Sequence, residues 1–213
     1  MDLRNRLDEA VARWALLQHP FYRAWTDGTL TRGALATYAK QYRHHVEAFP
    51  TYVSAVHARC GDDLAARRSL LENLVEEERG ERNHAALWVD FAEGIGAEGV
   101  RTAPAEPAVN ALVETFRGLT SRPAGQGAAA LYAYESQVPA VAAAKIDGLR
   151  RRYGVGDART LAFFEVHREL DVHHAAATAE IAGRLAASPD RAVEAAEAAA
   201  RALWRFLDAM PLA

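Results

Sequence analysis

The sequence is poor in the features that mark extracellular proteins, membrane proteins and proteins that bind polyanions. Cys60 is the single cysteine among 213 residues, so no internal disulfide can form. No apolar run reaches the length of a membrane span, and the amino-terminal residues lack the apolar core of a signal peptide. The formal net charge of −3 gives no polybasic signature. We therefore expect a cytoplasmic protein without nucleic-acid or membrane partners.

Lysine is almost absent, although cationic residues are common. Lys40 and Lys145 are the only lysines among 25 lysine and arginine residues. A GC-rich genome is the simplest explanation, and the abundance of alanine agrees with it. Lysine nevertheless differs from arginine, because its amine can lose a proton and act as a nucleophile. A lysine beside a reactive site would therefore be informative.

Helical periodicity covers the whole chain, without strand-like alternation or internal repeats. Half of the residues are hydrophobic, which suffices for the core of a single domain over residues 1–213. Pro50 and Pro139 are expected to bend or kink helices, because proline removes a backbone donor. The pattern predicts an all-α bundle of about seven or eight helices. The expected segments are residues 3–18, 31–59, 62–92, 108–119, 126–153, 157–187 and 190–210.

Residues 167–174, HRELDVHH, place two histidines and an aspartate along one strip of a helix. At about 100° per residue, offsets of four and seven residues return to the same face. His167, Asp171 and His174 therefore point the same way over about two turns. A metal site built on a helix needs this arrangement, although a solvated helix can show it by chance.

A second stretch, EEERGERNH, offers acids at several offsets from a histidine. In one continuous helix Glu77 lies about 20° around the axis from His84. Glu76 and Glu78 lie about 80° and about 120° away from that histidine. Glu77 is therefore the predicted partner of His84, and the flanking acids are expected to be solvated. Gly80 is a weak point inside this helix.

Glu135 stands alone among apolar residues in ALYAYESQVPAV. An unpaired buried carboxylate is costly, and a metal ion would supply the counter-charge. Mixed carboxylate and imidazole ligands suit iron or manganese better than a structural zinc ion, and they follow the logic of di-metal carboxylate bundles. The candidate ligands, from three helical segments, are Glu77, His84, Glu135, His167, Asp171 and His174.

This ligand pattern resembles the haem-oxygenase-like di-metal oxidases, whose fold thiaminases and pyrroloquinoline-quinone synthases share. More narrowly, the chain is similar to the chlamydial protein associating with death domains and its bacterial homologues, a folate-related group. The similar stretches are HPFY, YAKQY, AFPTYVSAVHARC, ALYAYESQVP and DVHHA. The resemblance implies a dinuclear centre, iron with manganese or two irons, that activates O₂ and receives electrons from an external reductant. We also expect a homodimer.

The resemblance further implies that the enzyme makes p-aminobenzoate, a folate precursor, from its own side chains. By motif match, Tyr22 in HPFY is the ring donor and Lys145 in AAAKI is the amine donor. Tyr134 is expected to assist as a nearby redox-active phenol. Phe163 departs from the family pattern, because a tyrosine is expected four residues before His167. Phenylalanine cannot form a phenoxyl radical, so a radical relay would need another residue, such as Tyr134.

Two alternatives stay open. A di-metal oxygenase that acts on an external small molecule would use the same ligands. A binding protein of the death-domain type would need no inward-facing metal ligands, so the complete ligand set argues against it. A site that reacts with O₂ also predicts an apolar pocket, lined by Tyr22, Phe163, Phe164 and the helix over residues 126–153.

Overall fold

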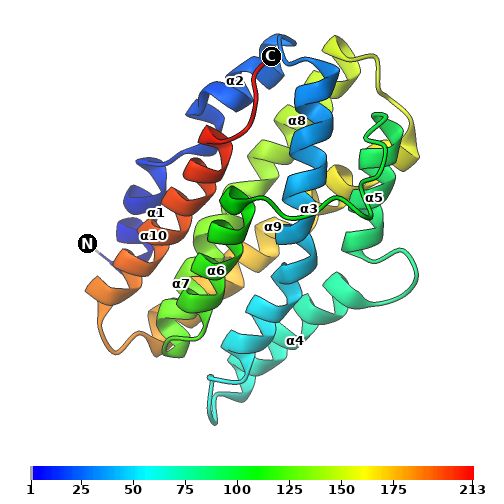
Figure 1. Ribbon diagram of the computed structural model, residues 1–213. Helices are drawn as coiled ribbons and strands as arrows, with labels where there is room; N and C mark the ends of the chain where they lie inside the picture. The colour runs from blue at the N-terminus through cyan, green and yellow to red at the C-terminus, as the bar shows by residue number, and fades with distance from the viewer. Residues whose placement is uncertain (1) are drawn as a thin grey trace.

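The computed structural model describes residues 2–213, which form a bundle of helices without a strand (Figure 1). The predicted all-α class is confirmed. The described residues contain ten α-helices and one short 3-10 helix, more than the seven or eight expected. They are α1 (Leu3–Ala12), η1 (Leu16–Gln18), α2 (Pro20–Asp27), α3 (Arg32–His57), α4 (Leu64–Glu78), α5 (His84–Gly94), α6 (Pro107–Thr120), α7 (Ala124–Glu135), α8 (Val138–Arg152), α9 (Ala158–Leu185) and α10 (Pro189–Asp208).

Two of the expected helices are divided, each for a local reason. Gly80 has a φ of 80°, which ends α4, and the Asn83 side chain then caps α5. The chain breaks again after Glu135, and Pro139 stands in the first turn of α8, where its missing N–H costs no helical bond. The expected kink at Pro139 is therefore a full break between α7 and α8.

The amino-terminal segment also differs from the expectation. The first helix ends at Ala12 instead of residue 18, and residues 20–27 form a helix outside the expected segments. Pro20 stands at the start of α2, and Gly28, with a φ of 76°, ends it. In contrast, α3 runs through Pro50 without interruption.

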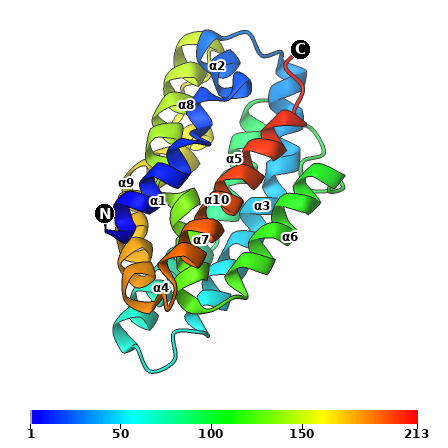
Figure 2. The ribbon, with the colours of Figure 1, turned by 90° about the vertical axis from the view of Figure 1, so that its left-hand side faces the viewer.

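The most deeply buried helix is α7, which packs against α9 and α10 (Figure 2). All residues from Gly127 to Glu135 are buried. Small residues allow this close packing: a Cβ atom on Gly125 would lie 2.4 Å from the backbone nitrogen of Ala186. Glu135 is the last residue of this buried helix, so its carboxylate lies in the core.

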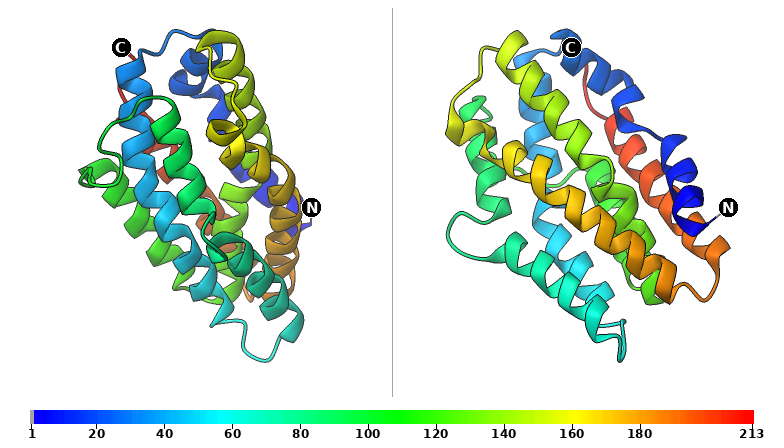
Figure 3. Two further views of the ribbon diagram at one scale, coloured as in Figure 1. Left: turned by 90° about the vertical axis from the view of Figure 1, so that its right-hand side faces the viewer. Right: turned by 180° about the vertical axis from the view of Figure 1, so that it is seen from behind.

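The helix α4 lies at the opposite end of the bundle from the carboxyl terminus (Figure 1). After α4 the chain turns back through residues 79–83 into α5, and both helices contact α9 (Figure 3). This corner brings the end of α4 and the start of α5 to the middle of α9. No helix within residues 2–213 is long and apolar enough to span a membrane.

Candidate metal centre

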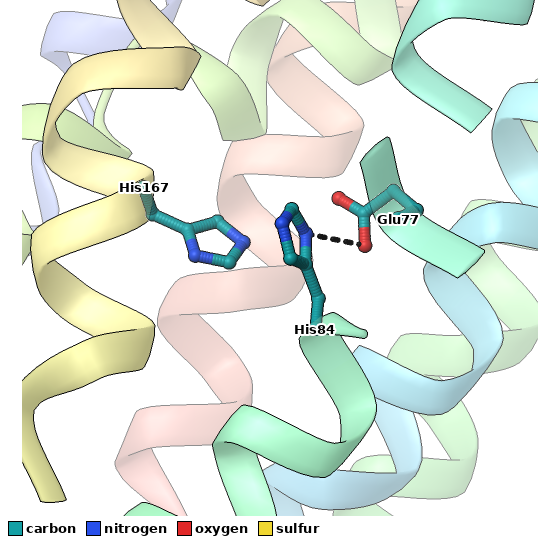
Figure 4. A group of neighbouring side chains, drawn as sticks. All are labelled: Glu77, His84 and His167. Atoms are coloured by element: carbon teal, nitrogen blue, oxygen red, sulfur yellow. Dashed lines mark ion pairs between the residues drawn. The ribbon is translucent and has the colours of Figure 1, made fainter. Parts of the chain in front are cut away.

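Three of the predicted ligands converge in the core, each from a different helix. Glu77 lies in the last turn of α4, His84 begins α5 and His167 lies within α9. One potential ligand atom from each residue lies within 4.8 Å of those of the other two, and all three residues are buried. Their side chains point toward one another (Figure 4). Within the described residues, this is the one such cluster of at least three potential ligands.

The contacts in this cluster are those of ligand atoms that face a common point. Glu77 Oε2 and His84 Nδ1 lie 2.9 Å apart, yet the ring nitrogen makes no hydrogen bond of acceptable geometry. Two ligand atoms at right angles, each about 2.1 Å from one ion, would lie about 3.0 Å apart. His167 Nδ1 donates to the Phe163 carbonyl over 2.7 Å, which leaves Nε2 free for a metal ion.

The reasoning that selected Glu77 was wrong, although the structure does bring Glu77 to His84. The two residues do not share a helical face, because α4 ends before α5 begins. The corner over residues 79–83 creates the contact instead. His167, Asp171 and His174 do lie on one helix, α9, and all three are buried.

Asp171 and His174 form a second part of the site, together with an acid that was expected to be solvated. His174 Nδ1 lies 3.1 Å from Asp171 Oδ1, and its Nε2 lies 2.6 Å from Glu76 Oε2. The Glu76 side chain is 41% exposed, so Glu76 closes the site toward solvent. Glu76 is exposed, as expected, but its contact with His174 was missed, because position on one helix says nothing about the approach of α9.

Glu135 is held by two polar side chains that the sequence analysis missed. Asn73 Nδ2 donates to Glu135 Oε1 over 2.9 Å, and Thr178 Oγ1 donates to Oε2 over 2.8 Å. Helical spacing could have identified both residues, because each lies on the same face as a predicted ligand. Asn73 precedes Glu77 by four residues, and Thr178 follows His174 by four. Such outer partners orient a ligand and tune its basicity.

The electrostatics of the site fit a bound cation. Burial raises the pKa of Glu135 to about 7 and that of Asp171 to about 6, and His174 opposes both shifts. Burial lowers the pKa of His174, but the hydrogen bond with Asp171 and the charge of Glu135 outweigh it and raise the pKa to about 9. Burial also lowers the pKa of His167, and the charge of His84 lowers it further.

Two predicted ligand atoms have no hydrogen-bond partner among the described residues: His84 Nδ1, as noted above, and Asp171 Oδ2. Asp171 Oδ2 is buried and makes no hydrogen bond. A buried carboxylate oxygen without a hydrogen-bond partner is costly in a protein core, and a metal ion removes that cost. The residues present therefore fit a metal centre, and their role as ligands stays a prediction.

A small cavity adjoins the cluster and confirms the predicted pocket. Its volume is about 20 Å³, which is room for about one water-sized molecule. Apolar side chains dominate the wall, and His167 links the cavity to the candidate ligands. The lining residues are Leu16, Tyr22, Tyr42, Tyr134, Val138, Val141, Ala142, Lys145, Phe163, Phe164 and His167.

Tyr22 and Lys145 both line the cavity, and both contact Tyr38, a residue that the sequence analysis did not single out. Lys145 Nζ donates to the Tyr38 hydroxyl over 2.7 Å, and the Tyr22 hydroxyl lies 3.2 Å from the same oxygen. Tyr38 belongs to the YAKQY stretch, whose two tyrosines are four residues apart and hence on one helical face.

The Lys145 amine is surrounded by aromatic rings and forms no ion pair with a described carboxylate. Its side chain is buried, with Nζ 4.8 Å from the centroid of the Tyr38 ring and 5.1 Å from that of Phe164. Burial lowers the pKa of the amine to about 7. Much of the amine is therefore neutral and nucleophilic near neutral pH.

Gly148 allows the close approach of α2, which carries Tyr22, and α8, which carries Lys145. A Cβ atom on Gly148 in α8 would lie 2.6 Å from Cδ1 of Trp25 in α2. Trp25 Nε1 also donates to the Lys145 carbonyl over 3.3 Å. The backbone of Lys145 is thus tied directly to the helix that carries Tyr22.

The buried amine predicts a pH dependence of stability. The pKa of Lys145 is about 7 in the folded protein and 10.5 ordinarily, so the unfolded chain binds more protons between these values. The free energy of unfolding should therefore rise from pH 7 to pH 9. For the metal-free protein, urea unfolding should show this rise to be about 2 kcal/mol larger than in Lys145→Met. Equal slopes in both proteins would contradict a buried, neutralised amine.

Comparison with known proteins places the chain among enzymes. A family model for iron-containing redox enzymes matches residues 36–207. The chain belongs to this family. The 4-aminobenzoate synthase of Nitrosomonas europaea is 43% identical, over 96% of this chain and 89% of its own length. The 4-aminobenzoate synthase of Chlamydia trachomatis serovar D is 41% identical, over 98% of this chain and 91% of its own length.

Solved structures show the same fold for this redox enzyme. A TenA homologue from Pseudomonas syringae superimposes with a TM-score of 0.80 at 20% identity, covering 97% of this chain and 89% of that one. The resemblance to haem-oxygenase-like oxidases is thus confirmed at the level of fold and enzyme class. Association with death domains gains no support.

Proposed function

We propose that this redox enzyme makes 4-aminobenzoate in an O₂-dependent reaction, with the ring of Tyr22 and the amino group of Lys145 as its substrates. Relatives that are 41% and 43% identical carry the name 4-aminobenzoate synthase. The observation that carries the proposal is the cavity, in which the two side chains meet beside His167. Its volume of about 20 Å³, room for about one water-sized molecule, is too small for an organic substrate.

The chain prepares the two proposed donors in different ways. Lys145 is kept partly neutral by burial, so its nitrogen has a free lone pair near neutral pH. Burial raises the pKa of the phenol of Tyr22, which therefore stays protonated. Tyr38 contacts both groups and can pass a proton between them. Holding reactants at contact distance lowers the entropic part of a barrier.

The six predicted ligands would hold the metal ions of the proposed reaction. Iron with manganese, or two irons, would supply the activation of O₂, with electrons from an external reductant. Tyr134, adjacent to Glu135, lines the cavity and remains the proposed redox-active phenol. The Phe163 ring stacks on His167 with centroids 4.0 Å apart, so the position where a tyrosine was expected abuts a predicted ligand.

An oxygenase acting on an external molecule is the main alternative. Sites for small organic ligands usually enclose about 300 Å³ or more. Such a substrate would need Tyr22 or Phe164 to move out of the cavity. The self-processing reaction needs no such movement, since both donors already line it. The homodimer, the single domain over residues 1–213, the cytoplasmic location and the absence of nucleic-acid partners stay predictions.

Intact mass and product count test the proposal together. Metal-loaded protein is exposed to O₂ and a reductant, and each sample is weighed by mass spectrometry before and after. We expect at most one 4-aminobenzoate per chain, with a matching fraction of chains changed in mass. Many products per chain, with the mass unaltered, would instead favour an external substrate.

A further inference from the structure

Tyr22 is held in place by a histidine that plays no part in the metal site. His19 precedes α2 and is 3% exposed. Its Nδ1 accepts a hydrogen bond from the Phe21 N–H over 3.0 Å, and its carbonyl accepts one from the Arg23 N–H over 3.0 Å. The two amides that flank Tyr22 are therefore both fixed by this one residue.

The cap works in one tautomer only. Helix caps are usually Ser, Thr, Asp or Asn, whose oxygens accept without any choice of tautomer. A neutral histidine accepts at Nδ1 only when its proton is on Nε2. Asp208, at the end of α10, accepts a hydrogen bond from the His19 Nε2–H group over 3.0 Å, which favours this tautomer. Trp204, also on α10, packs edge-on against the ring with centroids 4.7 Å apart.

We propose that His19, oriented by Asp208, is a positioning residue that ties α10 to α2 and sets Tyr22 for reaction with the group at Lys145. This inference rests on the proposed function. The Tyr22 hydroxyl contacts Tyr38, which in turn contacts Lys145, so a small shift of α2 breaks the chain of contacts. A misplacement of about 1 Å can lower a rate by about 100-fold. No predicted metal ligand lies on α2 or α10.

Substitutions at position 19 separate positioning from stability. His19→Ala should lower the rate of product formation by about 100-fold while metal content stays at the wild-type level. His19→Asn should restore the rate to within about threefold, because Asn Oδ1 takes the place of Nδ1 as the acceptor. Asp2→Ala is the matched control: it removes the cap of α1, which carries no site residue, and should leave the rate unchanged.

A second set of variants tests the tautomer. Asp208→Ala should slow the reaction when histidine stands at position 19 and have no effect when asparagine does, because asparagine needs no partner to set its acceptor. This double-mutant cycle does not depend on how well His19→Ala folds. Equal effects of Asp208→Ala in both backgrounds would overturn the proposal, as would failure of His19→Asn to restore the rate.

A spectroscopic readout keeps this inference separate from the proposed function. The ¹⁹F resonance of 3-fluorotyrosine at position 22, recorded on metal-free protein, reports the ring's surroundings without any turnover. It should shift in His19→Ala and return in His19→Asn. An unchanged resonance in His19→Ala would refute the positioning role. If wild-type protein makes no 4-aminobenzoate while the resonances behave as expected, the proposed function fails and the positioning of Tyr22 stands.

Discussion

Tyr22→Phe is expected to abolish 4-aminobenzoate formation and to leave the metal content unchanged. The substitution removes one hydroxyl, which contacts Tyr38 and no predicted metal ligand. The lost hydrogen bond should cost only about 1 kcal/mol of stability. The variant should therefore fold and bind metal, yet the ring it presents lacks the phenol required for oxidation. Product is measured by chromatography after one exposure to O₂ and reductant.

Two further variants define the result. Lys145→Arg should also give no product, because a guanidinium group stays protonated and offers no free amine. Tyr132→Phe is the matched control: Tyr132 is equally buried, but its hydroxyl bonds to Asp8, away from the cavity. It should form product as the wild type does. Product from Tyr22→Phe at the wild-type level would remove Tyr22 as the ring donor.

His167→Ala and Glu135→Ala are expected to lose metal and activity together. Each removes a buried side chain from a different part of the predicted centre. Because loss of an outer partner alone lowers metal affinity by about 10- to 100-fold, loss of a ligand should exceed about 100-fold. Affinity is measured by anaerobic iron titration with elemental analysis.

Neighbouring residues supply the controls for this experiment. Thr178→Val removes the hydroxyl that bonds to Glu135 and to the His174 carbonyl but leaves every predicted ligand in place, so its affinity should fall between those of the wild type and Glu135→Ala. His173→Ala removes an exposed histidine next to His174 and should bind metal normally. If wild-type protein holds no transition metal after anaerobic iron loading, the metal centre itself is refuted.

Sequence patterns predicted the fold class and the chemistry of the site because both depend on helical spacing. His167, Asp171 and His174 repeat at one face of α9, and that face is buried in the structure. Glu135 was conspicuous because it stands alone in an apolar segment. Periodicity within one helix is a local property, so a single sequence contains it.

The remaining features depend on contacts between helices, which local spacing does not specify. Glu77 meets His84 around a corner at Gly80, not along one face. Glu76 is exposed, as predicted, but its contact with His174 depends on the position of α9. In the sequence, Tyr38 has no feature that distinguishes it from other core tyrosines. Its contacts with Tyr22 on α2 and Lys145 on α8 depend on how these helices pack.

Isotope labelling tests the central claim most directly. Protein is produced with ring-¹³C tyrosine and ¹⁵N lysine, loaded with metal, and exposed to O₂ and reductant in unlabelled buffer. We predict 4-aminobenzoate that carries both labels, in an amount no greater than one per chain. The labels should vanish together with the product in Tyr22→Phe and Lys145→Arg. Unlabelled 4-aminobenzoate would contradict the account, because its ring and nitrogen would then come from outside the chain.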